Sequence, residues 1–290
     1  MSTFRLSSSL NLHSCSKDDP AEYIRQGINF LKKAGFDAAD FPMNSMLRLF
    51  GDNWETEIIA ARDYARKQGI TFEVCHLPFG VKIGGTPEEV KPFNDSMHRA
   101  IDAAKLMGVD YAVLHPNTTT VPMDAFDRQA QYDSVMTHLT PFAEHAAKVG
   151  LNIVVENMRV VPNGTPVHRY CQNPDELCDI ADALGIGICW DFGHANINAK
   201  DSGIPQSEAL TYVGSRLKVL HVNDNVAEDD LHLPPFIGIT DWKDAMKGLA
   251  ATGFHGLFNY ELSTARITPS LREDFARYIL NAAKEIMSYL

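Results

Sequence analysis

The chain has 290 residues, enough to bury the core of one α/β barrel or of two smaller domains. Its formal net charge of -11 disfavours a nucleic-acid partner, because affinity for nucleic acid depends largely on Lys and Arg at the phosphates. No apolar run approaches the length of a membrane span, so no membrane partner is expected. Residues 1–12 show no signal-peptide pattern, and the scattered cysteines include Cys75 and Cys189 inside predicted strands. These features predict a cytoplasmic protein with reduced thiols.

A strand near residues 4–10 opens the chain, and seven further strands each follow a helix that ends in glycine. These strands are predicted at residues 36–41, 70–75, 111–114, 153–155, 186–190, 217–220 and 257–260, after Gly35, Gly69, Gly108, Gly150, Gly185, Gly214 and Gly253. Glycine takes the left-handed conformation that closes a helix. Eight strands separated by helices predict a single-domain (β/α)8 TIM barrel over residues 1–290. The alternative, a doubly wound open sheet, would need a glycine-rich phosphate loop in residues 10–20, where the sequence has none.

The connections that follow the predicted strands are long, whereas those that lead into strands are short. The long ones are residues 116–131, 159–174, 196–207 and 223–241. This asymmetry is typical of an active site at the C-terminal end of a barrel. Residues 159–170, with Pro162 and Gly164, fit either a lid over a substrate or a plain surface excursion. A closing helix at residues 271–290 should pack on the exterior of the barrel.

The predicted strand at residues 186–190 ends abruptly at Asp191, and His194 follows three residues later. Gly193 lies between them and gives the backbone freedom to turn away from the strand. A carboxylate and an imidazole at the end of a buried strand suit a divalent metal ion. Asp191 is equally well explained as a helix cap or a turn residue, so both interpretations stand at this point.

Six consecutive predicted strands end in an acidic or imidazole side chain. These residues are His76, His115, Glu156, Asp191, His221 and Glu261. Strand ends converge on the axis of a barrel, and so many charged groups cannot be buried together without a compensating cation. In the long segment after the seventh strand, Asp230 and His232 are two residues apart and would share one side of an extended backbone. That segment is also explained as an acidic surface loop, since Glu228 and Asp229 precede Asp230.

With these motifs in order, the chain resembles the xylose isomerase-like TIM-barrel superfamily. Within it, the chain resembles most the sugar phosphate isomerase/epimerase group, which is related to the metal-dependent apurinic endonucleases. The resemblance rests on His76-Leu-Pro, His115-Pro, Glu156-Asn, Asp191-Phe-Gly-His194, His221-Val-Asn-Asp, Asp230-Leu-His232 and Tyr-Glu261-Leu. In the epimerases it implies one divalent ion held by Glu156, Asp191, His221 and Glu261. In the endonucleases it implies three ions, one of them shared by His76, His115 and Glu156, one on the epimerase set, and one on His194, Asp230 and His232.

The chain retains all nine of these positions, so the ligands alone do not separate the two activities. Residues 234–236 intervene before Ile237-Gly238, which departs from the endonuclease pattern and puts the third site in question. The acidic net charge also speaks against a DNA substrate. The ligand types fit Mn²⁺, Mg²⁺, Co²⁺ or Zn²⁺.

We therefore expect an isomerase or epimerase that moves a proton next to a carbonyl group of a sugar or sugar phosphate, through an enediolate. By resemblance, Glu156 and Glu261 are the catalytic acid and base. The expected contacts to the substrate are His76, His115, His194, Asp230, His232 and Arg159, the last toward a phosphate or another acidic group of the substrate. The alternatives are a metal-dependent phosphodiesterase on abasic DNA, a lyase or dehydratase on a keto-acid, and a binding protein without catalysis. The sequence is compatible with a homo-oligomer and does not fix its size.

Overall fold

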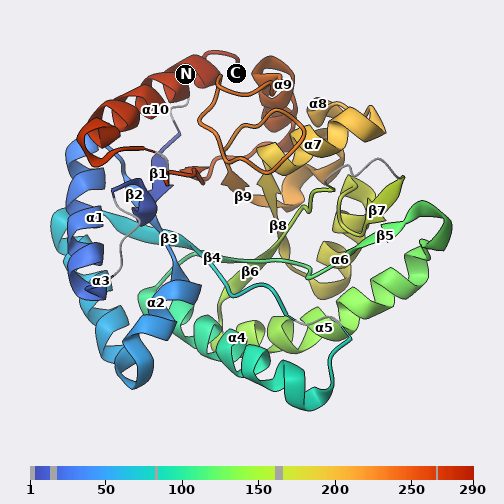
Figure 1. Cartoon of the computed structure of the whole chain (residues 1–290), viewed down its shortest axis with the longest axis horizontal. Coiled ribbons are helices and arrows are strands. Elements are labelled where there is room, and N and C mark those ends of the chain that lie inside the picture. The colour runs from blue at the N-terminus through green and yellow to red at the C-terminus, as the bar shows by residue number, and fades with distance from the viewer. Residues whose placement is uncertain (1–3, 14–17, 82–83, 161–165, 266) are drawn as a thin grey trace.

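The computed structural model describes residues 4–13, 18–81, 84–160, 166–265 and 267–290, and its centre is a ring of eight parallel strands surrounded by helices (Figure 1). The strands are β1 (Leu6–Ser9), β2 (Ala38–Phe41), β3 (Thr71–His76), β4 (Tyr111–Leu114), β6 (Asn152–Glu156), β8 (Gly187–Asp191), β9 (Leu217–His221) and β10 (Phe258–Tyr260). They pair in the order β10-β1-β2-β3-β4-β6-β8-β9. The ring closes beside β9, where the Val222 N–H donates to the Asn259 carbonyl at 2.8 Å and the Val222 carbonyl accepts from the Glu261 N–H at 3.3 Å. The predicted TIM barrel is confirmed, and the open doubly wound sheet is excluded.

Helices cover the outside of this ring. They are α1 (Pro20–Ala34), α2 (Met43–Phe50), α3 (Trp54–Gln68), α4 (Pro87–Met107), α5 (Arg128–Val149), α6 (Pro174–Leu184), α7 (Phe192–Ser202), α8 (Gln206–Val213), α9 (Trp242–Thr252) and α10 (Arg272–Met287). Left-handed glycines close α1, α3, α4, α5, α6 and α9 as predicted, at Gly35, Gly69, Gly108, Gly150, Gly185 and Gly253. Gly214 differs, with φ 57° and ψ -137°, because it turns the chain from α8 into a short 3-10 turn. As predicted, α10 packs on the exterior, between α1 and α9.

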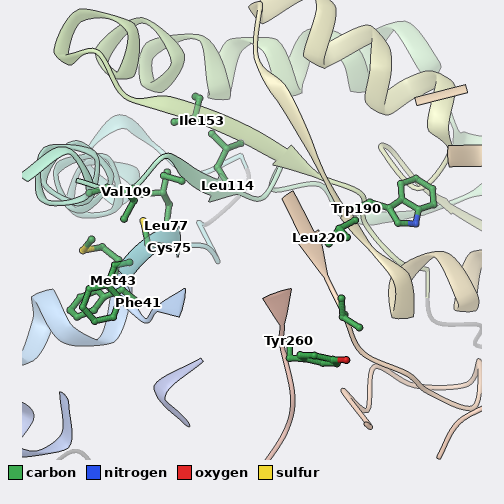
Figure 2. Close-up of a cluster of buried hydrophobic side chains, with 14 of the residues drawn as sticks. Phe41, Met43, Cys75, Leu77, Val109, Leu114, Ile153, Trp190, Leu220 and Tyr260 are labelled. Atoms are coloured by element: carbon green, nitrogen blue, oxygen red, sulfur yellow. The ribbon is translucent and has the colours of Figure 1, made fainter. Parts of the chain in front are cut away.

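Alternate residues of each strand face opposite sides of the sheet, and this period of two separates the interior of the barrel from its outer layer. The interior is filled by apolar side chains, namely Ala38, Val74, Val113, Val154, Cys189, Val219 and Leu257. Their neighbours in sequence belong to a second, larger cluster that packs between strands and helices, as Figure 2 shows for Cys75, Leu114, Trp190 and Leu220. The cysteines of the described residues are all buried and free. The same alternation brings an inward-facing position to the C-terminal end of each strand.

Two of the long segments after strands are joined to each other. Strand β5 (Thr120–Pro122) pairs antiparallel with β7 (Val167–Arg169), and the two form a small ribbon outside the barrel. The predicted lid segment therefore contains a strand, although Pro162 and Gly164 fall outside the described residues. No helix in the described ranges is long and apolar enough to cross a membrane.

The segment at residues 196–207 was expected to be a long loop, and this prediction is wrong. Helix α7 starts directly after β8, because the Asp191 carboxylate caps it by accepting from the His194 N–H at 2.7 Å. Gly193 also has a different role from the predicted turn, since it lies inside α7. A Cβ atom at this position would lie 1.9 Å from Asn223 Oδ1, so glycine is needed there for close packing.

Candidate metal centre and substrate cavity

The strand alternation explains why the predicted strand-end residues point into the mouth of the barrel. His76, His115, Glu156, Asp191 and His221 each lie two positions after an interior side chain, and Glu261 lies four positions after Leu257. The structure brings all six together. Glu156, Asp191 and His221 are at most 1 % exposed, so these side chains are buried directly above the interior core, at the C-terminal end of the barrel.

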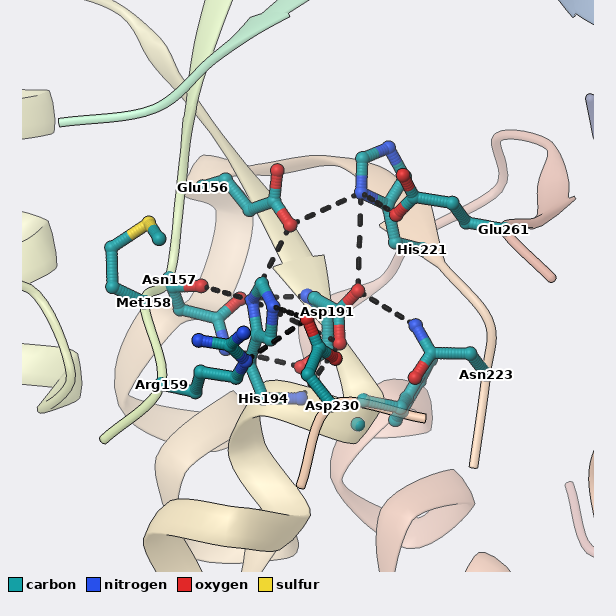
Figure 3. Close-up of polar contacts among 12 residues, drawn as sticks. Glu156, Asn157, Met158, Arg159, Asp191, His194, His221, Asn223, Asp230 and Glu261 are labelled. Carbon is teal, nitrogen blue, oxygen red and sulfur yellow. Dashed lines mark hydrogen bonds and ion pairs between the residues drawn. The ribbon is translucent and has the colours of Figure 1, made fainter. Parts of the chain in front are cut away.

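The central cluster consists of Glu156, Asp191, His221 and Glu261, from four different strand ends (Figure 3). His221 Nδ1 lies 3.2 Å from Glu156 Oε1, 3.0 Å from Glu261 Oε2 and 4.0 Å from Asp191 Oδ2. The four candidate ligand atoms all lie within 4.8 Å of one another. This is the set that the resemblance to the sugar epimerases implies for a single divalent ion.

His76 and His115 form a second cluster with the other oxygen of Glu156. His76 Nε2 lies 3.5 Å and His115 Nε2 3.2 Å from Glu156 Oε2. The two Nε2 atoms are 3.1 Å apart, and His76 Nδ1 lies 2.8 Å from the Leu77 carbonyl. A proton on that Nδ1 leaves the Nε2 of His76 free to bind a cation. Glu156 is therefore placed between two groups of ligand atoms.

The third cluster consists of His194, Asp230 and His232. His194 Nε2 lies 3.5 Å and His232 Nε2 3.2 Å from Asp230 Oδ2, so the residues inserted at 234–236 do not separate them. His232 has a left-handed φ of 45°, a strained conformation for a residue other than glycine. The neighbouring Glu228 and Asp229 are exposed. The surface-loop interpretation thus applies to these two residues and not to Asp230.

The predicted substrate contact Arg159 reaches this third cluster. Its Nε lies 2.9 Å from Asp230 Oδ2, and its side chain is 27 % exposed. In Figure 3 its guanidinium lies beside His194 and Asp230. The structure therefore gives Arg159 an acidic partner from the protein itself.

The electrostatics of the site favour a bound cation. Among the described residues, no lysine or arginine lies within 4.0 Å of the carboxylates of Glu156, Asp191 and Glu261. Glu156 Oε2 is buried and accepts no hydrogen bond there. Burial would lower the pKa of His194, but the Asp191 and Asp230 carboxylates raise it to about 9. The carboxylates thus attract positive charge, which either protons on imidazoles or a divalent ion can supply, and the donor set fits such an ion.

Asparagines that the sequence analysis did not select hold Asp191 in place. The Asp191 N–H donates to Asn157 Oδ1 at 2.6 Å, and Asn157 Nδ2 donates to the Asp191 carbonyl at 3.0 Å. Asn223 Nδ2 donates to Asp191 Oδ2 at 2.7 Å. Both asparagines belong to the motifs that carry the resemblance. Their closeness in sequence to Glu156 and His221 is the signal from which a role in the site could have been predicted. Such supporting hydrogen bonds commonly orient metal ligands.

Asp224 organises the segment that carries Asp230 and His232. Its carboxylate accepts backbone hydrogen bonds from Phe236, Gly238 and Thr240 at 3.0 to 3.2 Å, and a bond from the Thr240 hydroxyl at 2.7 Å. A Cβ atom on Gly238 would lie 2.2 Å from Asp224 Oδ1, so the segment wraps tightly around this carboxylate. Because Asp224 is buried and fully engaged, its role is to position the segment.

A cavity of about 400 Å³ opens beside the clusters. It is lined by Ser9, Asn11, Asp40, Pro42, Asn44, Ser45, His76, Phe79, His232, Glu261, Leu262 and Ser263. Burial raises the pKa of Asp40 to about 6, although Asn259 Nδ2 donates to it at 2.9 Å. The Phe79 ring is 53 % exposed and stacks on His115 with 4.9 Å between ring centroids. Sequence reasoning missed both residues, although Asp40 lies two positions after interior Ala38 and the alternation could have found it.

The chain matches the family model described as xylose isomerase-like TIM barrel over residues 28–282. It belongs to this family. It is 24 % identical to fructoselysine 3-epimerase of Shigella flexneri over 206 residues, covering 68 % of this chain and 67 % of the relative. It is 26 % identical to the probable endonuclease 4 of Moorella thermoacetica over 208 residues, covering 67 % and 70 %.

Solved structures share the whole fold of this xylose isomerase-like chain. It superposes on D-psicose 3-epimerase with D-tagatose, from Clostridium cellulolyticum H10, with a TM-score of 0.72, 14 % identity and coverage of 98 % and 99 %. At this identity the likeness establishes the fold alone. Since the curated relatives include an epimerase and an endonuclease, activity has to be argued from the site.

Proposed function

We propose that this protein is a divalent-metal-dependent sugar isomerase or epimerase that transfers a proton next to a carbonyl group. The observation that carries the proposal is the placement of Glu156 and Glu261 on the same imidazole nitrogen, His221 Nδ1, at 3.2 and 3.0 Å. Two carboxylates that converge on one small volume can remove a proton from a carbon and return one to it. The names of the relatives, which include sugar 3-epimerases, support the same reaction class.

The two carboxylates differ in access to the cavity. The side chain of Glu261 is 31 % exposed and lines the cavity, whereas that of Glu156 is 1 % exposed. Burial would raise the pKa of Glu261, but His221 and His232 outweigh it and hold the pKa below its ordinary value. Glu261 is therefore ionised at the cavity wall, which is the protonation state that a general base requires.

The residues of the central cluster would hold the ion, and the cavity would hold the sugar. A divalent ion bound at Glu156, Asp191, His221 and Glu261 would attract electrons from a carbonyl oxygen, which lowers the pKa of the neighbouring C–H. The hydroxyl, amide and carboxyl groups of Ser9, Asn11, Asp40 and Asn44 line the cavity beside it. These groups suit the hydroxyls of a ketose or a ketose derivative.

A metal-dependent phosphodiesterase is the second candidate, and one observation favours it. All nine residues of the three-ion pattern gather in three clusters, the third one included. The net charge of -11 opposes it, because a duplex substrate would have to approach an acidic protein. Arg159 is a further objection, because its guanidinium already supplies positive charge to Asp230 in the third cluster.

Solvent deuterium exchange tests the proposal. The metal-free protein is reloaded with Mn²⁺, Mg²⁺, Co²⁺ or Zn²⁺ and incubated in heavy water with a panel of ketoses and ketose phosphates, and NMR follows deuterium at the carbons next to the carbonyl. The proposal predicts uptake in at least one sugar that stops when the metal is removed. Cleavage of an abasic DNA duplex without exchange in any sugar would contradict the proposal and favour the phosphodiesterase.

A further inference from the structure

Backbone carbonyls hold both histidines of the third cluster. His194 Nδ1 lies 2.8 Å from the Asn157 carbonyl, and His232 Nδ1 lies 2.9 Å from the Glu261 carbonyl. A carbonyl only accepts, so each Nδ1 carries a proton, and each Nε2 is directed at Asp230 Oδ2. Two ring nitrogens and one carboxylate oxygen therefore converge on one point, an arrangement that needs positive charge nearby.

The protein itself supplies a fixed positive charge at this point. Arg159 Nε lies 2.9 Å from Asp230 Oδ2, the oxygen that both histidines face. Arginine stays protonated in proteins, so this charge cannot be removed by a change of pH. Among the described residues, no arginine or lysine comes within 4.0 Å of the carboxylates in the other two clusters. In the part of the chain that the structure describes, this fixed positive charge thus belongs to the third cluster alone.

From this contact we infer that Arg159 takes the place of a metal ion at His194, Asp230 and His232. An ion bound to Asp230 Oδ2 would lie a few ångströms from a guanidinium on the same oxygen, and the two positive charges would repel each other with little solvent between them. The central cluster has no such competitor in the described residues and keeps its capacity for a divalent ion. Arg159 would therefore distinguish this chain from a three-ion enzyme. The chain has the ligands of the third ion, but the Arg159 guanidinium already supplies the positive charge that they need.

The metal content of Arg159 variants tests this inference without any assay of catalysis. The protein is loaded with excess Zn²⁺, desalted, and its bound zinc per chain is measured by elemental mass spectrometry. Arg159→Gln should bind one ion more per chain than the parent, and the double variant Arg159→Gln/Asp230→Asn should lose that ion again. Arg159→Lys keeps the charge and should bind the parental number.

Arg169→Gln is the matched control. Arg169 is a neighbouring arginine whose Nε bonds Thr118 at 3.0 Å and whose Nη1 donates to the Arg159 carbonyl at 3.4 Å. It forms no ion pair with the three clusters in the described residues, so its removal should leave the zinc content unchanged.

If Arg159→Gln does not fold, the single variant Asp230→Asn, which keeps Arg159, still tests the inference. Asp230→Asn should leave the zinc content of the parent unchanged, since no ion is expected at that carboxylate. A loss of one ion in Asp230→Asn, or equal zinc content in the parent and a folded Arg159→Gln, would overturn the inference. The zinc content is measured without any assay of the reaction, so the inference and the proposed function can fail separately.

Discussion

Asp191 and His194 are linked by a hydrogen bond that gives one carboxylate two tasks. Asp191 Oδ1 accepts from the His194 N–H at 2.7 Å and so caps helix α7. Asp191 Oδ2 accepts from Asn223 at 2.7 Å and faces His221 Nδ1 at 4.0 Å. The sequence left a helix cap and a metal ligand as alternatives for this residue, and the geometry allows both at once.

Asp191→Asn and Asp191→Ala should separate these tasks. Asn is as good a helix cap as Asp, and the Asn223 amide can flip so that its free Oδ1 accepts from the Nδ2 of the new side chain, so the free energy of unfolding of the metal-free Asn variant should be no lower than that of the parent. Ala also removes the helix cap, so Asp191→Ala should lower the free energy of unfolding by about 1 kcal/mol. Both variants should weaken metal binding, by at least about tenfold if Asp191 is a ligand. Urea unfolding and metal titration calorimetry measure the two effects, and parental metal affinity in Asp191→Asn would remove Asp191 from the ligand set.

Asp40→Asn should change how stability depends on pH. Burial raises the folded pKa of Asp40 from 3.8 to about 6, so its contribution to stability is fully present below pH 3.8 and is lost as the pH rises through about 6. Asn is neutral at every pH and can still accept from Asn259. From pH 4 to pH 8, the free energy of unfolding of the metal-free variant should therefore rise relative to that of the parent by on the order of 2–3 kcal/mol. Urea unfolding at both pH values checks this, and a constant difference would contradict it.

The fold and most of the clusters could be predicted because they depend on local rules. Glycine caps mark the helix ends, and the period of two carries Val74 to His76 and Val154 to Glu156. The same rule also reaches Asp40 from Ala38, but Asp40 lies inside the predicted strand at residues 36–41 and not at its end, so the strand-end pattern does not include it.

The remaining features depend on contacts between distant segments, which the sequence does not specify. Arg159 meets Asp230 only because Asp224 fixes the segment around it. The sequence predicts a turn at Gly193, because the contact that requires glycine there is with Asn223, which is 30 residues away in the chain. Phe79 lies in a loop with no periodic pattern, so only the structure shows that it stacks on His115.

Phe79→Ala should weaken substrate binding with little effect on folding. The ring is 53 % exposed and forms an apolar wall of the cavity, so its loss removes contact with a bound sugar. An aromatic contact contributes about 0.5–1.5 kcal/mol, which corresponds to a roughly 2- to 13-fold rise in KM. Leu271→Ala is the control, because Leu271 is equally exposed at 53 % and does not line the cavity. An unchanged KM in Phe79→Ala, measured with the sugar identified by exchange, would exclude Phe79 from the substrate site.

Glu261→Gln should separate metal binding from proton transfer. The carboxamide oxygen can still contact an ion, but the variant loses the charge and the group that accepts a proton. Metal affinity should fall, and saturating metal should not restore turnover. General acid–base catalysis contributes on the order of 10²–10⁴-fold, so kcat should fall by at least that factor.

A matched control for this variant is Glu176→Gln. Glu176 is also buried, at 1 % exposure, but it bonds His168 Nε2 at 2.7 Å and the Cys171 N–H at 3.0 Å, away from the clusters. Its substitution should lower stability and leave kcat of the folded protein near that of the parent. If two carboxylates serve the two faces of the substrate, Glu261→Gln should block net epimerisation while Glu156 still exchanges deuterium at one face. A metal-saturated Glu261→Gln that epimerises at the parental rate would show that Glu261 transfers no proton, and the reaction would then need another base in the cavity.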